Sequence, residues 1–281
     1  MQGAWRPRAV IPLRVPTGAF FFMAEPIVID GRRAWLKQYG EGGRALALGT
    51  LGFVARLFHL QALRPPPHRG GEAARDIEAR RIAELRAQAV NVPQVLGTGR
   101  AALVLSDNGR SLASCLREAD DAGRDALVRH ALAAIARSHA HGAYFGQPLP
   151  RNMTFDGEQI GFIDFEEDPL EVMDLAQAQA RDWLMFGYGV ARYYEHRLPA
   201  LQQMLAEAMC EEGAPVVAHA HAVTGRLQPM ARVLRLGGSA RALAHSILVL
   251  HAATTLSVLV IALVCVDWFS DGQLDMLGLL G

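Results

Sequence analysis

Lysine occurs once in this chain, at Lys37, whereas arginine supplies every other side chain in the total of 28 Lys and Arg residues. An ammonium is a compact point charge and a guanidinium is a planar fork, so the two are not interchangeable at a binding site. A chain that otherwise uses arginine has reason to keep one lysine where a compact charge is needed. Chance retention of one lysine is the alternative. Lys37 is therefore the first candidate for a residue that performs chemistry.

Asn152 and Asp164 are the next candidates, because both carry an oxygen that could bind a cation. They lie 12 residues apart, on either side of a hairpin whose turn is Asp156-Gly157. Such a hairpin would bring both side chains to one side of a cleft. Amide and carboxylate oxygens are ligands that Mg²⁺ prefers. Taken singly, an Asn or Asp near a turn is more often a turn former or a helix cap.

The elements around these residues follow from hydrophobic periodicity and from turn residues. Strands come first, a charged helix that carries Glu78 follows them, and the second half of the chain is mostly helical. This order predicts an α+β fold. We expect strands over 26–29, 34–39, 94–96, 101–105 and 159–165, helices over 46–63, 72–88, 111–118 and 124–141, and mainly helix over 171–211.

In this order the pieces resemble the protein kinase-like fold, which has a small β-rich lobe and a larger helical lobe. Lys37 matches the lysine on the third strand of the small lobe, and Glu78 matches its partner on the following helix. Asp107 ends the strand that leads into the hinge, and with Lys37 and Glu78 it is expected to bind the cofactor. The segment 139–152 has the spacing of the catalytic loop, and the segment 163–166, Ile-Asp-Phe-Glu, takes the place of the metal-binding Asp-Phe-Gly.

The resemblance implies that ATP and Mg²⁺ are the cofactors. Lys37 would hold the α- and β-phosphates, and Glu78 would orient Lys37. Asn152 and Asp164 would hold Mg²⁺, since phosphoryl transfer depends mainly on positioning and on charge neutralisation. Asp182, on a later helix, would anchor the catalytic loop.

Three departures from the family pattern stand out. Gln147 occupies the place of the catalytic Asp, and a side-chain amide cannot accept a proton at neutral pH. No glycine-rich loop precedes the first strand, since Thr17 to Glu25 holds only Gly18. Asp164 lies only about 10 residues before the helix expected near Asp174, which leaves no room for a long activation segment. The short form resembles compact kinases that act on lipopolysaccharide core sugars, on small molecules or within tRNA-modification complexes.

Residues 246–265 form an uncharged, mostly apolar run of 20 residues. A helix of this length spans about 30 Å, the thickness of the hydrocarbon core of a bilayer. Arginines precede the run and aspartates follow it, which predicts that the preceding domain faces the cytoplasm. The alternative is a buried core helix, and His251 within the run favours that alternative because polar groups in lipid are costly.

The expected organisation therefore has five parts, and it places the protein at the cytoplasmic membrane with the bilayer as a partner. They are a small lobe over 1–105, a large lobe over 106–213, a basic juxtamembrane segment over 214–243, a transmembrane helix over 244–267 and a short acidic tail over 268–281.

Composition narrows the classes of function. Apolar residues make up 51% of the 281 residues and charged residues 20%, which excludes a disordered chain. The net charge is zero, so we expect no nucleic-acid partner. Three widely spaced cysteines exclude a disulfide scaffold.

Three hypotheses for the function remain. The first is a membrane-anchored kinase-like phosphotransferase that binds ATP and Mg²⁺ and acts on a cell-envelope sugar or lipid precursor. The second is a pseudokinase that binds nucleotide or a partner without turnover. The third is a helical membrane-associated adaptor whose motif matches are accidental. Gln147 separates the first two hypotheses, and nucleotide binding separates both from the third.

Overall fold

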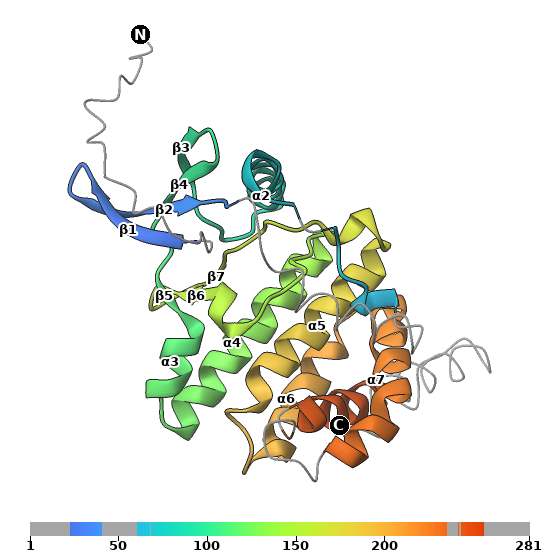
Figure 1. Cartoon of the computed structure of the whole chain (residues 1–281). Helices are drawn as coiled ribbons and strands as arrows, with labels where there is room; N and C mark the ends of the chain where they lie inside the picture. Colours follow the sequence, from blue (N-terminus) through green and yellow to red (C-terminus); the bar gives the residue numbers. More distant parts are fainter. Residues whose placement is uncertain (1–22, 41–60, 68, 235–240, 242, 256–281) are drawn as a thin grey trace, which may run out of the picture.

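The computed structural model describes residues 23–40, 61–67, 69–234, 241 and 243–255. Within these residues the protein is α+β, with a small sheet lobe and a larger helical part (Figure 1). The expected order of strands and helices is confirmed within a few residues at each end. Predictions for residues 1–22, for 46–60 of the first expected helix and for the tail lie outside the described residues.

The main sheet has four antiparallel strands in the order β1-β2-β4-β3. Asp30 and Gly31 join β1 to β2, and both have positive φ angles, of 49° and 75°. Two such residues form the tight hairpin turn that matches the right-handed twist of the flanking strands, and Asp and Gly tolerate that backbone best. The strands are β1 (Met23–Ile29), β2 (Arg32–Gln38), β3 (Val95–Gly99) and β4 (Ala102–Ser106).

Helix α2 (Gly71–Ala87) packs against β4 and covers the sheet (Figure 1). Its buried residues include Ala74, Ile77, Ile82 and Leu85, at the spacing that gives a helix one apolar face. Glu78 lies on the same buried face, although it is charged. A carboxylate in that position needs a partner across the interface.

A second, small antiparallel sheet connects the two parts of the molecule, with its strands in the order β5-β6-β7. Its strands are β5 (Arg110–Ser111), β6 (Met153–Phe155) and β7 (Ile160–Phe162). Just past the paired ends of β6 and β7, the Ile163 amide donates a hydrogen bond to the Asn152 carbonyl, at 2.9 Å. The hairpin therefore brings Asn152 beside the residue that precedes Asp164, as its spacing predicts.

The helical part surrounds α5, which carries fully buried large residues such as Trp183 and Phe186. Asp174 and Gln177 begin α5 with reciprocal hydrogen bonds between side chain and backbone, which satisfy amides that the first turn leaves free. The helices are α3 (Leu112–Glu118), α4 (Asp121–Ala140), α5 (Leu175–Ala191), α6 (Leu198–Met209) and α7 (Ala214–Leu234), with short 3₁₀ turns η1 (Gln61–Leu63), η2 (Pro150–Asn152) and η3 (Pro169–Glu171).

The predicted transmembrane helix over 244–267 is wrong. Among the residues that the structure describes, no helix is both long enough and apolar enough to cross a membrane. Residues 243–255, which include 246–255 of the apolar run, are helical and contribute to the core of the helical part, and residues 256–265 lie outside the described residues. The prediction that the domain faces the cytoplasm depended on that helix and loses its support.

Packing against α5 and α7 explains why the described part of this run, residues 246–255, is apolar. Leu250 lies directly over Gly187 of α5, where even a Cβ atom would approach Leu250 Cδ1 to 2.6 Å. His251 stacks on His221 of α7, with 4.5 Å between the ring centroids. The polar residue that favoured a core helix in the sequence therefore has a partner within the protein.

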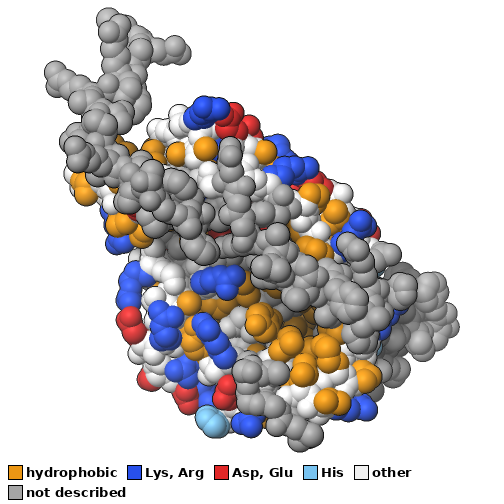
Figure 2. All heavy atoms as spheres, viewed as in Figure 1, with side chains coloured by type: hydrophobic (Ala, Val, Ile, Leu, Met, Phe, Trp, Pro, Cys, Tyr) orange, Lys and Arg blue, Asp and Glu red, His pale blue; other side chains and the backbone are white. Residues whose placement is uncertain are grey.

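The surface carries charges of both signs. Figure 2 shows basic and acidic side chains on the sheet lobe and on the helical part, with hydrophobic side chains between them on the helical part. Exposed pairs such as Arg110–Glu118 and Arg129–Glu207 account for part of this mixture. Such exposed pairs contribute little to stability.

Candidate functional site

Four side chains from three segments meet where the sheet lobe faces the helical part. We call Lys37, Glu78, Asp164 and Glu166 the Lys37 cluster. Lys37 Nζ on β2 lies 2.6 Å from Glu78 Oε2 on α2 and 2.7 Å from Asp164 Oδ1, in the segment after β7. Glu166 Oε2 is 3.9 Å from the same nitrogen. The partners lie 41 and 127 residues from Lys37 in the sequence, so only the fold brings them together.

The Lys37 cluster is largely removed from solvent. The exposed fraction of the side chain is 11% for Lys37, 1% for Glu78 and 6% for Glu166, whereas Asp164 keeps 29%. Burial alone would lower the pKa of Lys37, but the carboxylates of Asp164, Glu78 and Glu166 outweigh it and raise that pKa. Lys37 is therefore a fixed positive charge over the whole physiological pH range.

Only one of the two carboxylate oxygens of Glu78, Oε2, accepts hydrogen bonds from the described residues. Tyr39 donates its hydroxyl proton to Glu78 Oε2 at 2.7 Å, the same oxygen that Lys37 contacts. Burial and the Glu78 carboxylate raise the pKa of Tyr39, so the phenol remains a donor. Glu78 Oε1 is buried without a hydrogen-bond partner among the described residues. A buried oxygen without a partner is costly, and such groups collect at functional sites.

The three carboxylates crowd around one ammonium. Oxygens of Glu78, Asp164 and Glu166 lie within 4.8 Å of one another, and the Lys37 ammonium is the cation among them. Asp164 has a positive φ angle of 75°, a left-handed backbone that non-glycine residues seldom adopt. Backbone strain of this kind clusters at active sites and ligand clamps.

Asn152 and Gln147 lie on the loop that leads into β6. Asn152 is buried, and its Nδ2 donates to the Gln147 carbonyl at 3.1 Å, which leaves its amide oxygen as the atom able to bind a cation. Gln147 Nε2 donates to Glu167 Oε2 at 2.9 Å. Gln147, Glu167 and Asp164 line the same small cavity, of about 10 Å³.

Asp182 on α5 anchors the loop that carries Gln147, as the sequence predicts. Its carboxylate accepts hydrogen bonds from the backbone amides of Phe145, at 2.7 Å, and Gly146, at 2.6 Å. His139 Nε2 lies 3.2 Å from Asp182 Oδ2, and His139 Nδ1 lies 2.7 Å from Glu212 Oε1. We call His139, Asp182 and Glu212 the His139 cluster.

Each member of the His139 cluster has at least two hydrogen-bond partners. Burial alone would lower the pKa of His139, but hydrogen bonds to Asp182 and Glu212 raise it to about 9. Glu212 also accepts a hydrogen bond from Trp183 Nε1 at 3.0 Å. The imidazole is therefore a buried cation between two carboxylates at neutral pH. Sequence reasoning missed Glu212, since it lies 73 residues from His139 and belongs to no motif.

A second contact that the sequence did not predict ties α2 to the segment after Asp164. Asp168 accepts hydrogen bonds from Arg80 on α2 at 2.6 Å and from the Tyr144 hydroxyl at 2.7 Å. Burial would raise the pKa of Asp168, but these two donors and the nearby charge of Arg81 lower it. Arg81 also stacks on the Tyr144 ring, 3.7 Å from its centroid. Together these contacts hold α2, and with it Glu78, in place.

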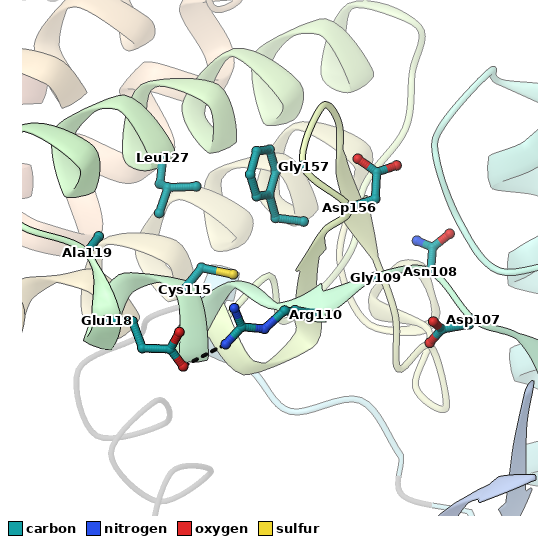
Figure 3. A pocket seen from close by; sticks show the side chains of 11 residues that line it. Asp107, Asn108, Gly109, Arg110, Cys115, Glu118, Ala119, Leu127, Asp156 and Gly157 are labelled. Atoms are coloured by element: carbon teal, nitrogen blue, oxygen red, sulfur yellow. Dashed lines mark hydrogen bonds and ion pairs between the residues drawn. The ribbon is translucent and has the colours of Figure 1, made fainter. Parts of the chain in front are cut away.

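Asp107 lies away from the Lys37 cluster, at the rim of a cavity of about 750 Å³ between β5, α3, α4 and the β6–β7 turn. Its carboxylate accepts a hydrogen bond from Trp35 Nε1 at 2.7 Å. Figure 3 shows Asp107 and Asp156 on one side of this cavity, Leu127 on the other, and the Arg110–Glu118 ion pair along its edge. None of the titratable residues that line it is buried, so the Lys37 cluster is the stronger candidate site.

The structure thus brings Lys37, Glu78 and Asp164 into direct contact and places Asn152 and Gln147 on the adjacent loop. Of the residues proposed from sequence, Asp107 alone lies at the separate cavity. Neither a scan against models of protein families nor a search of curated proteins finds a match for the chain.

Proposed function

We propose that this protein is kinase-like: it binds ATP with Mg²⁺ at the Lys37 cluster and transfers the γ-phosphoryl group to a hydroxyl acceptor. The observation that carries the proposal is the buried ion pair of Lys37 with Glu78 and Asp164. This ion pair uses the only lysine of the chain, a residue that the amino-acid composition by itself singles out.

Each residue has a separate task in this proposal. Lys37 presents a permanent ammonium to phosphate oxygens, and Glu78 with Tyr39 fixes where that ammonium lies. Asn152 and Asp164 offer one amide and one carboxylate oxygen, which fit the hard, oxygen-preferring Mg²⁺. Mg²⁺ would supply charge neutralisation for the phosphates during transfer.

The acceptor that we propose is a small hydroxyl compound of the sugar type, as the resemblance to compact envelope-sugar kinases implies. The connection from Asp164 to the start of α5 at Leu175 supports a small acceptor. It is short and is occupied by η3 and by the contacts of Asp168. A segment of this length leaves little surface to dock an extended peptide.

Nucleotide binding without turnover is the second candidate, and Gln147 is the observation that favours it. The catalytic Asp of the family stands where this chain has an amide that cannot accept a proton. Under both candidates Lys37 and Asp164 bind Mg²⁺-ATP, so the first experiment concerns binding.

Replacing Lys37 by Arg tests the proposal, because Arg keeps the charge but not its compact shape. We expect titration calorimetry to show clearly weaker Mg²⁺-ATP binding for Lys37→Arg than for the parent. Arg32→Lys, the reverse exchange at an exposed position of the same strand, should bind as the parent does. Asp164→Ala should remove the dependence of binding on Mg²⁺. Equal affinity of Lys37→Arg and parent would contradict the proposed site.

A further inference from the structure

We propose that Glu167 is the general base of the transfer reaction and that Gln147 positions it. The inference rests on the proposed function and concerns the place where the chain departs most from the family pattern. In the sequence, Gln147 occupies the position of the catalytic base and cannot accept a proton. The structure has a carboxylate within one hydrogen bond of that position, since Gln147 Nε2 donates to Glu167 Oε2 at 2.9 Å.

Glu167 lies in the right place for this task. It comes 20 residues after Gln147, in the segment that follows Asp164, and the fold returns it to the loop. Gln147, Glu167 and Asp164 line one small cavity, so the carboxylate and the proposed metal ligand face the same space. Arg181, nine-tenths buried or more, lines that cavity too, and its guanidinium attracts the Glu167 carboxylate.

The Gln147 amide suits a positioning role. An amide N–H can only donate, so it orients a carboxylate by binding one of its oxygens. The main-chain carbonyl of Gln147 accepts a hydrogen bond from Asn152 Nδ2 at 3.1 Å, which ties the loop to the metal side of the site.

The proposed step needs no reactant besides ATP and the acceptor hydroxyl. The acceptor hydroxyl gives its proton to a Glu167 oxygen while the acceptor oxygen forms a bond to the γ-phosphorus. The bond between that phosphorus and the β–γ bridging oxygen breaks, and ADP leaves with the bonding electron pair. Glu167 then releases the proton to solvent. With water as acceptor, the products are ADP and inorganic phosphate.

Isosteric replacement of Glu167 by Gln tests the proposal, with ATP hydrolysis as the assay and water as the acceptor. Loss of a general base costs about 10²–10⁴-fold in rate. Because phosphoryl-transfer transition states are loose, we expect a loss near the lower end, about 10²-fold. The affinity for Mg²⁺-ATP, measured by calorimetry, should stay within about twofold of the parent, since a base is not a phosphate ligand. Glu158→Gln, the same change at an exposed position of the β6–β7 turn, should hydrolyse ATP as the parent does.

Exchanging the two residues gives the decisive second variant. Gln147→Glu combined with Glu167→Gln keeps one amide and one carboxylate but moves the carboxylate to the loop. We expect this double variant to recover at least about 10-fold of the rate lost in Glu167→Gln, within the range of acid–base assistance. A merely structural role for Glu167 would not produce such recovery.

The outcomes separate this inference from the proposed function. A parent protein that does not bind Mg²⁺-ATP overturns both. A parent that binds but hydrolyses no more ATP than Asp164→Ala leaves nucleotide binding standing and overturns Glu167 as base. Equal hydrolysis by Glu167→Gln and Glu158→Gln also overturns it alone. A selective loss in Glu167→Gln with recovery in the double variant supports it.

Discussion

The Lys37 cluster and the His139 cluster both hold one buried cation among carboxylates, yet they satisfy their charges differently. In the His139 cluster, Asp182 also accepts hydrogen bonds from two backbone amides, and Glu212 also accepts one from Trp183 Nε1. Each carboxylate there is bonded by several donors. In the Lys37 cluster, Lys37 contacts Glu78, Asp164 and Glu166, but Glu78 Oε1 is buried and has no hydrogen-bond partner among the described residues.

Under the proposed function, this difference is expected, since the His139 cluster would stabilise the fold and the Lys37 cluster would bind a ligand. A buried ionic network contributes to stability only when its members are satisfied by hydrogen bonds, and a partly satisfied network is costly. The His139 cluster meets that condition and fixes the loop that carries Gln147. The Lys37 cluster does not meet it, and a bound cation with phosphates would supply what it lacks. We therefore expect stability to respond strongly to changes in the His139 cluster and weakly to changes in the Lys37 cluster.

The largest expected loss of stability comes from Asp182→Ala. The change leaves the Phe145 and Gly146 amides buried without their acceptor and His139 without one of its two partners. Breaking such a buried network costs about 3–5 kcal/mol. Denaturant unfolding should show this loss, and Asp121→Ala, which breaks an exposed pair with Arg124, should cost less than about 1 kcal/mol. Similar losses for both variants would remove the distinction between the two clusters.

The second-largest expected effect is a dependence of stability on pH that arises from His139. Its neighbours raise the pKa of His139 from the ordinary 6.5 to about 9. A raised pKa in the folded state gives stability that is fully present below about pH 6.5 and is lost as pH rises through about 9. At about 1.4 kcal/mol for each pH unit of difference, the loss amounts to about 3 kcal/mol.

Comparison with His139→Gln isolates this contribution, because other groups also titrate in alkali. The difference in unfolding free energy between parent and variant should be largest near pH 6 and shrink by pH 10. His141→Gln, at an exposed position nearby, should follow the parent across the range. A difference that stays constant with pH would mean that folding does not shift the pKa of His139.

Much of the Lys37 cluster could be predicted from sequence, because each member carries a local signal. Lys37 is unique in composition, Glu78 lies in a periodic charged helix, and Asp164 follows a hairpin with a clear Asp-Gly turn. The His139–Glu212 and Gln147–Glu167 contacts carry no such signal. Glu166 and Glu167 are adjacent acidic residues in the sequence. Only the path of the chain after β7 shows that Glu166 faces Lys37 and that Glu167 contacts Gln147.

The error over residues 246–265 has a physical cause of the same kind. An uncharged run of 20 residues has one sequence pattern whether lipid or protein surrounds it. The difference lies in the partners, here Gly187 and His221, which belong to other helices. Hydropathy reports that a segment is excluded from water. It cannot distinguish burial in lipid from burial in the core of a protein.

Glu166→Gln should have the smallest effect, and it tests the Lys37 cluster most directly. Glu166 is the most distant of the three carboxylates from Lys37 Nζ, at 3.9 Å, and like charges repel it from Glu78 and Asp164. Removing its charge therefore costs attraction to Lys37 but relieves repulsion of similar size. We therefore expect the unfolding free energy to fall by clearly less than the roughly 3–5 kcal/mol expected for Asp182→Ala. A loss as large as that of Asp182→Ala would show that the Lys37 cluster is a structural network like the His139 cluster, and the contrast that marks it as a ligand site would disappear.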